Sequence, residues 1–303
     1  MFNKSTLSLL SLIICSHAFA SSLEPYSKIE INNKNTLYTI NDANIDLAAS
    51  LFQNVPQSIT DSLLKAHSGD SEPSFRTPIN TFLIAKDGQN YLIDAGGGEC
   101  LGQDGNKTRK VLEQLNIAPN KINGVLLTHA HTDHICGLAT YNKEKDKWEP
   151  SYPNATLFIN ELEYQHWVVQ ENDKQVKAIL NAYSNLGTDK IVKFKAGDKL
   201  VDTFEVFDAK GHTVGHSAFL WQPEDQEAWI FFGDIIHNTD NQFANPEITI
   251  SFDSNPTDAI KSRNYFLEQA FINKWNIAGA HINSPGIGKV DFSDKTYKWL
   301  PHK

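Results

Sequence analysis

The chain has 303 residues, with 27 Lys and Arg against 36 Asp and Glu, and a formal charge of −9. This length can bury a sizeable core, either in one large α/β domain or in two modest ones. The acidic balance argues against nucleic acid as a partner, because phosphate binding requires concentrated Lys and Arg. No apolar run after residue 20 is long enough to span a bilayer.

The first twenty residues have the layout of a secretory signal peptide: MFNKSTLSLLSLIICSHAFA. Lys4 stands near the start, an apolar segment covers residues 7–15, and the tripeptide Ala-Phe-Ala at 18–20 is a small-x-small cleavage site. A lipoprotein site at Cys15 is the weaker alternative, since the bulky Ile14 precedes it. The sequence therefore predicts a periplasmic or secreted protein.

The mature chain, residues 21–303, holds no repeat and no linker rich in Pro, Gly or Ser, which predicts a single domain. Residues 29–40 alternate as in a hairpin. Residues 51–78 are polar and rich in turn residues, which predicts an excursion from the core that could serve as a lid or a dimer segment. Strands are expected at 81–85 and 91–94, the latter nearly all apolar as in a buried strand.

Four candidate metal ligands follow another apolar strand, at 124–128, in the stretch LTHAHTDHICGL. Within six positions the chain places His129, His131, Asp133 and His134. Imidazole nitrogen and carboxylate oxygen are the ligands of zinc and related divalent ions. A helix start capped by Thr132 or Asp133, with the histidines on the surface, is the alternative. Four ligand types so close together favour the metal site.

The other predicted elements alternate between strands and helices, which indicates sheet layers covered by helices. Strands are expected at 155–160, 204–209, 217–221, 228–232 and 275–280, and helices at 108–115, 161–169, 173–186 and 257–272. Three of these strands end next to a further ligand candidate: His212 follows 204–209, Asp234 follows 228–232, and His281 follows 275–280. Sites in layered α/β folds lie where strands open onto a common edge, so we expect these side chains to meet the first group.

Four segments resemble successive motifs of the metallo-β-lactamase superfamily in its two-metal form: HAHTDH, GHTVGHS, FFGDIIHN and GAHINSPGIG. The match runs from about residue 81 to the end of the chain. Within the superfamily, GDIIHN, FDSNPTDAIKSRN and AHINSPGIG resemble the methyl parathion hydrolase branch, which lies close to the N-acyl homoserine lactonases. The resemblance implies a four-layer αβ/βα sandwich, with two mixed sheets flanked by helices and the metals at the sheet edges.

The resemblance also implies how the ligands are shared. The first metal would take His129, His131 and His212, the second Asp133, His134 and His281, and Asp234 would bridge both. Zinc is the first expectation, although manganese, cobalt and iron accept the same ligands. Two such ions can share a hydroxide that attacks the substrate, while one of them polarises a carbonyl or phosphoryl oxygen. Asp133 or Asp234 could take and return the proton.

Several residues near these motifs are weaker candidates. His216 is expected to support the ligands or to pack, and His237 to orient Asp234 or to lie on the surface. Asp94, in YLIDAGGG, is either a capping residue of a Gly-rich turn or, by resemblance, a carboxylate beside the metal loop. Position along the chain suggests four aromatic residues for a substrate pocket: Phe75, Phe82, Trp167 and Phe243.

Cys100 and Cys136 are the two cysteines of the mature chain. In an oxidising compartment an even pair suggests a disulfide. Two unrelated small buried residues are the equal alternative.

The function expected from these observations is hydrolysis of lactones or esters, such as N-acyl homoserine lactones or aryl esters, with organophosphate triesters as a side activity. A metallo-β-lactamase-type or thioesterase-type hydrolase is one alternative, and a non-catalytic exported metal-binding protein is another. β-Lactamases of this fold lack the bridging aspartate and use a cysteine at the second metal, whereas Asp234 is present here. The partner is expected to be a small molecule, and branch members are often dimers, which extends the expectation of a homodimer to this chain.

Overall fold

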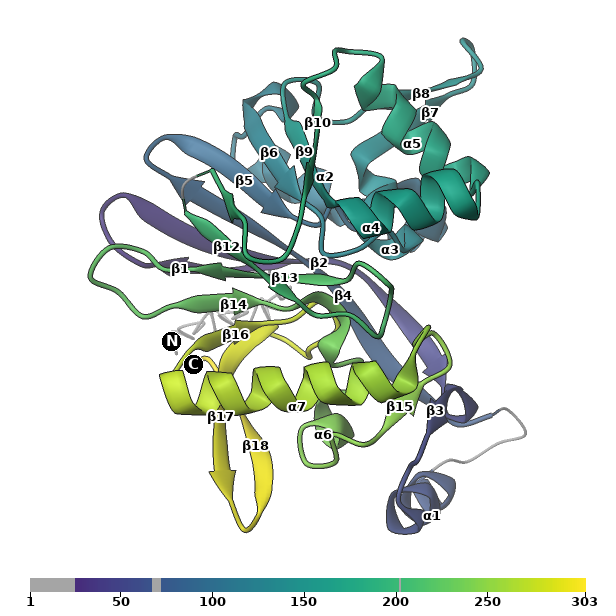
Figure 1. The fold of residues 1–303 in the computed structure, drawn as a ribbon, viewed down its shortest axis with the longest axis vertical. Coiled ribbons are helices and arrows are strands. Elements are labelled where there is room, and N and C mark those ends of the chain that lie inside the picture. Colours follow the sequence, from purple (N-terminus) through teal and green to yellow (C-terminus); the bar gives the residue numbers. More distant parts are fainter. Residues whose placement is uncertain (1–24, 67–71, 202) are drawn as a thin grey trace, which may run out of the picture.

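The computed structural model describes residues 25–66, 72–201 and 203–303, so the predicted signal peptide lies outside the described residues. Two seven-stranded sheets lie face to face, and helices cover their outer faces (Figure 1). This is the four-layer αβ/βα sandwich that the resemblance implied. Within the described residues, no helix combines the length and the apolar character needed to cross a bilayer.

The first sheet joins an antiparallel half to a parallel half. Its strands, in spatial order, are β1 (Tyr26–Glu30), β2 (Asn35–Ala48), β4 (Ser74–Lys86), β5 (Gln89–Ile93), β6 (Ile122–Leu126), β9 (Thr156–Asn160) and β10 (Ile191–Phe194). The strands from β1 to β5 pair antiparallel, and those from β5 to β10 pair parallel. The carboxyl ends of β5, β6 and β9 therefore meet at one edge of the sheet.

The second sheet is mostly antiparallel. Its strands, in spatial order, are β11 (Lys199–Leu200), β12 (Phe204–Asp208), β13 (Ser217–Trp221), β14 (Trp229–Phe231), β16 (Asn276–Ala278), β17 (Ile287–Ser293) and β18 (Thr296–Pro301). The central pair β14 and β16 is parallel, so both of these strands deliver the residues after them to the same edge. The hairpin of β17 and β18 was not predicted from the sequence.

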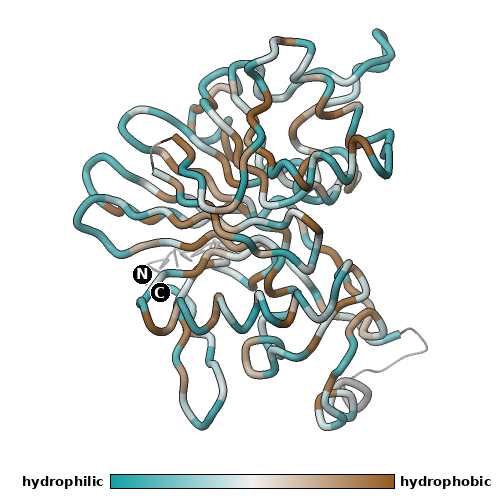
Figure 2. The backbone as a smooth tube through the Cα atoms, in the orientation of Figure 1, coloured by the Kyte–Doolittle hydropathy of each residue, from teal (hydrophilic) through white to brown (hydrophobic). Residues whose placement is uncertain are grey.

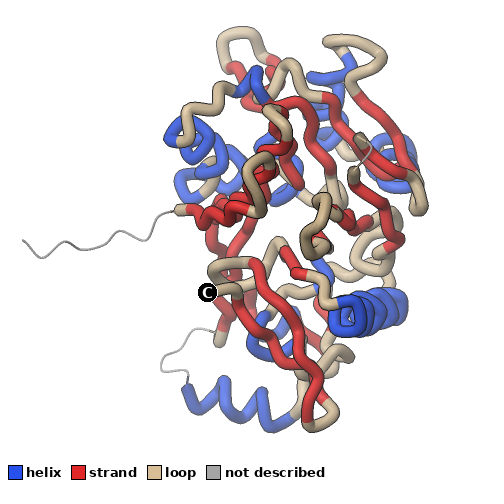
Figure 3. The backbone as a smooth tube through the Cα atoms, turned by 90° about the vertical axis from the view of Figure 1, so that its left-hand side faces the viewer, coloured by secondary structure: helices blue, strands red, loops and turns tan. Residues whose placement is uncertain are grey.

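The helices lie mainly on the outer faces of the two sheets, as the ribbon and the view turned by 90° show (Figures 1 and 3). The helices are α1 (Gln57–Ala66), α2 (Lys107–Gln114), α3 (Thr132–Ile135), α4 (Glu161–Tyr164), α5 (Lys174–Ser184), α6 (Thr239–Gln242) and α7 (Pro256–Asn273). Short 3-10 turns occur at Ala49–Leu51, Gly98–Asp104, Pro119–Lys121, Cys136–Leu138 and Gly233–Ile235, and a π-helical segment at Gln165–Gln170. Two-stranded sheets pair β3 (Phe52–Gln53) with β15 (Thr249–Ile250), and β7 (Ala139–Asn142) with β8 (Lys147–Pro150).

Alternation along the strands divides the apolar side chains between two layers. On β4, Phe82 and Ile84 point into the core between the sheets, while Leu83 points under the helices. Phe82 lies 5.3 Å from Phe231 of the opposite sheet, ring centre to ring centre. The apolar segments concentrate along these central strands (Figure 2).

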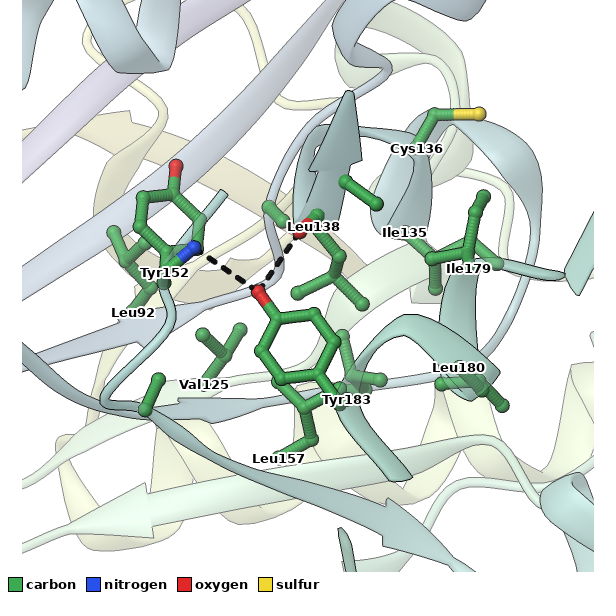
Figure 4. Close-up of a cluster of buried hydrophobic side chains, with 14 of the residues drawn as sticks. Leu92, Val125, Ile135, Cys136, Leu138, Tyr152, Leu157, Ile179, Leu180 and Tyr183 are labelled. Atoms are coloured by element: carbon green, nitrogen blue, oxygen red, sulfur yellow. Dashed lines mark hydrogen bonds between the residues drawn. The ribbon is translucent and has the colours of Figure 1, made fainter. Parts of the chain in front are cut away.

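The core under α5 contains a buried hydroxyl as well as apolar side chains. Tyr183 donates a hydrogen bond to the carbonyl of Leu138 at 2.8 Å and accepts one from the backbone N–H of Tyr152 at 3.2 Å (Figure 4). Burial raises the pKa of Tyr183, so the hydroxyl keeps its proton. Residues 138 and 152 are thereby tied to a helix that lies 31 to 45 residues further along the chain.

The segment 51–78 was predicted to leave the core over its whole length, but the projecting part is shorter. Residues 51–66 form β3 and α1, which project from the main body (Figure 1). Residues 74–78 instead belong to β4 and pair with β2. The prediction failed because Pro78 resembles a strand breaker. Strand β5 pairs only with residues 82–86 of β4, so at Pro78 the side of β4 that would face β5 is a free edge. A proline is tolerated there because no neighbouring strand needs the N–H that proline lacks.

Candidate metal centre

Connections after four strands bring the ligand candidates to one place. The segment 128–131 and α3 follow β6, residue 212 lies between β12 and β13, the turn Gly233–Ile235 follows β14, and residue 281 follows β16. Within each of three overlapping groups the ligand atoms lie within 4.8 Å of one another. The seven predicted ligands that meet in this way are His129, His131, Asp133, His134, His212, Asp234 and His281.

The first cluster places three imidazole nitrogens and one carboxylate oxygen around a common point. Nδ1 of His131 lies 3.0 Å from Nε2 of His129 and 2.9 Å from Nε2 of His212. Oδ2 of Asp234 lies 3.2 Å from Nε2 of His212 and 3.7 Å from Nε2 of His129. Tetrahedral zinc with bonds of 2.0–2.1 Å would separate its ligands by roughly 3.3 Å, so these distances fit one cation.

The second cluster shares Asp234 with the first. Oδ2 of Asp133 lies 3.5 Å from Nε2 of both His134 and His281. Asp234 approaches the same two rings, with Oδ1 3.1 Å from Nε2 of His134 and Oδ2 3.1 Å from Nε2 of His281. Asp234 therefore lies between the clusters and contacts histidines of both.

Hydrogen bonding alone does not satisfy these buried atoms. Nδ1 of His131 faces two ring nitrogens at 3 Å or less, and a single proton there can serve one of them. Nε2 of His134 and Oδ1 of Asp234 are buried and lie 3.1 Å apart, but neither has a partner in hydrogen-bond geometry within the described part of the chain. Unsatisfied buried polar atoms are costly. A cation in each cluster would satisfy these atoms, so the residues present fit two divalent metal ions.

The electrostatics of the cluster also suit a cation. Burial holds the pKa of His129 well below its usual range and lowers that of His131 to about 3, so both rings are neutral. Burial also lowers the pKa of His212, but the carboxylates of Asp234 and Asp253 outweigh it and raise that pKa to about 9. Burial would raise the pKa of Asp234, yet the surrounding histidines keep it well below its usual range. The carboxylates of Asp234 and Asp253 thus attract positive charge. A metal ion that binds His212 would displace the proton on that ring.

The outward nitrogen of each of three ligand rings has a fixed partner. Nδ1 of His134 lies 2.8 Å from Oδ2 of Asp94, which also accepts the Thr128 hydroxyl. Nδ1 of His212 lies 3.0 Å from Oδ1 of Asp253, and Nδ1 of His281 lies 2.8 Å from the carbonyl oxygen of Pro78. Such partners set the tautomer and leave Nε2 free to bind a metal.

Of the two roles that the sequence left open for Asp94, its contacts support the carboxylate beside the metal loop. It has a positive φ of 58° at the start of the Gly-rich turn, and its Oδ1 accepts the backbone N–H of Thr128 at 2.8 Å. Its side chain therefore holds Thr128 and orients His134, whereas the backbone N–H of Gly97 in the turn donates to Oδ2 of Asp42 at 3.0 Å.

The other two histidines near the ligands support Asp234. His216 donates from Nδ1 to the carbonyl of Ala209 at 2.9 Å, and its Nε2 accepts the backbone N–H of Asp234 at 3.1 Å. Both ring nitrogens of His216 are thus occupied. Nε2 of His237 lies 3.2 Å from Oδ2 of Asp234, and its ring stacks on His281 with centres 5.2 Å apart.

A cavity of about 400 Å³ opens over the cluster. Five ligand candidates reach it, together with His237 and Asp173. Its remaining walls are mostly apolar and come from β2, the turn Gly98–Asp104, the segment 128–131, the π-helical segment, α5 and the loop after β15. The apolar residues that line it are Ile45, Leu47, Leu101, Ala130, Trp167, Val176 and Phe252.

Of the four aromatic residues predicted for a pocket, Trp167 lines this cavity and the other three lie elsewhere. Phe82 is in the core between the sheets. Phe243 is buried and stacks on Trp299, with ring centres 4.8 Å apart. Phe75 packs on Phe52 beside the projecting segment. The prediction was wrong for these three because position along the chain does not show which layer a side chain joins.

The site contains two buried carboxylates that the sequence analysis missed. Asp253 holds His212. Its segment, FDSNPT, indicates a resemblance to the family branch but not this contact. Glu163 is fully buried in α4 beside the first cluster. The signal that could have found it is Trp167 one helical turn further on, within reach of the Glu163 side chain.

Cys100 and Cys136 form a disulfide, with Cα atoms 6.1 Å apart. The bond joins the turn Gly98–Asp104 to the residues directly after α3. Leu101 of that turn lines the cavity. The structure thus supports the disulfide, and not the alternative of two unrelated buried cysteines.

Residues 75–281 match the protein family described as "Metallo-beta-lactamase superfamily". Among curated proteins, the exodeoxyribonuclease YycJ of Bacillus anthracis is 27% identical over 139 residues. That match covers 46% of this chain and 42% of the relative, so the chain spans less than half the length of that protein.

Two solved structures are similar over most of their length. The hydrolase AbOPH, described as a member of the beta lactamase superfamily, superposes with a TM-score of 0.80 and 27% identity. The match covers 92% of this chain and 98% of AbOPH. AidC, described as a dizinc quorum-quenching lactonase in complex with an N-acyl homoserine product, has a TM-score of 0.78 and 22% identity, covering 92% and 97% of the two chains. The likeness to AidC is one of fold.

Proposed function

The chain belongs to the metallo-β-lactamase superfamily, and from this premise we propose that it hydrolyses lactones and carboxylic esters with the help of two divalent cations, zinc first among them. The observation that carries the proposal is the cavity, in which apolar walls stand directly over the His and Asp cluster. An apolar acyl or aryl group suits these walls, and the bond to be broken then lies next to the cluster.

The composition of the cavity favours neutral substrates over anionic ones. The described residues that line it include no Lys and no Arg. Nucleic acids and other polyanionic substrates need such side chains or metals dedicated to their phosphates. A lactone or a neutral ester needs apolar contact and a group that polarises its carbonyl, which this site offers.

The roles of the residues follow from their positions. His129, His131 and His212 would hold the first cation, and Asp133, His134 and His281 the second, with Asp234 contacting both. When bound, the two cations lower the pKa of water to near neutrality and polarise a carbonyl oxygen. Asp133 lines the cavity with 19% of its side chain exposed, against 3% for Asp234. Of the two carboxylates, that of Asp133 is therefore the better placed to accept a proton and release it to the leaving oxygen, through the oxygen that does not face His134 and His281.

The finer assignments rest on the sequence. Membership of the methyl parathion hydrolase branch and a side activity on organophosphate triesters are supported by the motifs GDIIHN, FDSNPTDAIKSRN and AHINSPGIG. Export is supported by the composition of residues 1–20. Dimer formation through the projecting segment 51–66 belongs to the same set of proposals.

The test is a panel of aryl esters, δ-lactones, N-acyl homoserine lactones, paraoxon-type triesters and nitrocefin, with metal content measured on the same zinc-loaded sample. We expect the highest kcat/KM on lactones or aryl esters that carry an apolar group, and less than a hundredth of that on nitrocefin. Two bound metals without hydrolysis of any ester or lactone would support the non-catalytic metal-binding protein instead.

A further inference from the structure

Glu163 accepts hydrogen bonds from four donors although its side chain is completely buried. Oε1 accepts the backbone N–H of Ala130 at 3.1 Å and the indole N–H of Trp167 at 2.6 Å. Oε2 accepts the hydroxyl of Thr213 at 2.8 Å and the backbone N–H of Gly215 at 2.9 Å. One carboxylate thus joins three segments that are distant in sequence.

Two of these segments carry the ligands of the first cluster. Ala130 lies between His129 and His131, and Thr213 directly follows His212. Glu163 therefore holds the backbone between His129 and His131, and it holds the hydroxyl of the residue that follows His212. Its third partner, Trp167, lines the cavity, and the indole ring lies 5.5 Å from the ring of His131.

The loop after His212 packs directly against α4. A Cβ atom on Gly215 would come within 2.5 Å of the backbone nitrogen of Glu163, so the contact requires glycine at that position. The hydrogen bonds that Thr213 and Gly215 donate to Glu163 therefore form where the backbone of this loop already touches α4, which gives the loop little room to move.

The charge of Glu163 has no cationic side chain beside it. Its four partners are N–H and O–H groups, and within the described residues it forms no ion pair. A buried carboxylate is costly unless hydrogen bonds and a nearby positive charge compensate it. The proposed first cation would lie between the two loops that Glu163 holds and would supply that charge.

We propose that Glu163 is a positioning residue for the first cation. It fixes the spacing between the 129–131 loop and His212, and its charge favours a cation between them. This inference rests on the two-cation site of the proposed function. It concerns metal affinity, so it can be tested without knowing the substrate.

The test is a zinc titration of Glu163→Gln against a chromophoric chelator. Glutamine keeps the size of the side chain, but it turns an NH₂ group towards two of the four donors. We expect one of the two zinc ions to bind about 10–100-fold more weakly, the range typical of residues that support metal ligands, while the other keeps its affinity.

The matched control is Tyr183→Phe. It also removes a buried polar group that joins distant segments, here Tyr152 and Leu138, but it lies in the core under α5 (Figure 4). Urea denaturation should show lower stability for both variants. Zinc affinity should fall for Glu163→Gln and stay unchanged for Tyr183→Phe.

The outcomes separate this inference from the proposed function. If the unmutated chain binds fewer than two zinc ions, the two-cation site itself is wrong. If it binds two and Glu163→Gln binds both as tightly, the role of Glu163 is overturned. Should Glu163→Gln not fold, Thr213→Val decides, because it removes one donor to Oε2 beside His212. Weaker binding of one zinc ion supports the inference, and unchanged affinity for both overturns it.

Discussion

Asp94 and His134 are joined by a contact of 2.8 Å between Oδ2 and Nδ1, and on the other side of the cluster Asp253 and His212 form a similar contact of 3.0 Å. Each carboxylate fixes one ligand ring, and the two rings belong to different clusters. The affinities for the two proposed cations can therefore be lowered one at a time by mutation.

We expect Asp94→Asn to lower the affinity for the second cation, and Asp253→Asn to lower the affinity for the first, each by about 10–100-fold. Asparagine tolerates the positive φ of position 94, so the backbone there is kept. Zinc competition measures both steps, and each variant serves as the control for the other. Equal loss at both sites in either variant would contradict the assignment of ligands.

Removal of the metals should abolish hydrolysis and lower stability together. Dialysis against a strong chelator leaves the nitrogens of His129, His131 and His212 facing one another without a cation. When the free zinc concentration is 100 times the Kd of a site, zinc binding at that site adds about 2.7 kcal/mol to the free energy of unfolding. This corresponds to a Tm change on the order of 5–10 °C for each site. Scanning calorimetry and an ester assay, before and after zinc is returned, measure both effects. Activity that survives complete chelation rules the mechanism out.

Phe252→Ala should raise KM for substrates with long apolar groups and leave kcat nearly unchanged. Phe252 lines the cavity, and 48% of the residue is exposed, so its loss removes contact with the substrate at little cost to folding. Loss of about 40–60 Å² of apolar contact corresponds to roughly 1–1.5 kcal/mol, or about five- to tenfold in KM.

The control for this prediction is Phe292→Ala on β17. Phe292 is 45% exposed and does not line the cavity. Its replacement should leave KM unchanged for every chain length. If both variants change KM equally, the cavity is not where the apolar group binds.

Cys100→Ser should lower the free energy of unfolding by about 4 kcal/mol, because the disulfide closes a loop with a sequence separation of 36 residues. Urea denaturation with and without reductant measures the effect. Reductant should destabilise the unmutated chain and leave Cys100→Ser unaffected. A sensitivity to reductant that persists in Cys100→Ser would show that it arises elsewhere in the chain.

The ligands could be predicted because each stands directly after an apolar strand, and the ends of neighbouring strands share an edge. His129 and His281 are 152 residues apart, yet the sheet order brings them together. The wall of the cavity could not be predicted in the same way. Ile45 and Leu47 reach it because β2 and β4 continue as a pair beyond β1 and β5, which depends on the pairing of β2 with residues 74–78.

Glu163 and Asp253 escaped prediction for a related reason. Their main partners, Ala130 and Thr213 for Glu163 and His212 for Asp253, belong to other elements, and a carboxylate in a short polar motif looks the same whether it faces water or such a partner. Burial distinguishes the two cases, and burial is a property of the assembled layers. Phe82 shows the reverse error, since an aromatic residue near the motifs belongs to the core between the sheets.

The acceptor that holds His281 is the carbonyl of Pro78, a group that every amino acid carries. Replacing residue 78 does not remove this oxygen, so variation there can leave no trace in the orientation of the imidazole. Comparisons built on side-chain identity will pass over such a contact in distant homologues. Only the path of the main chain reveals it.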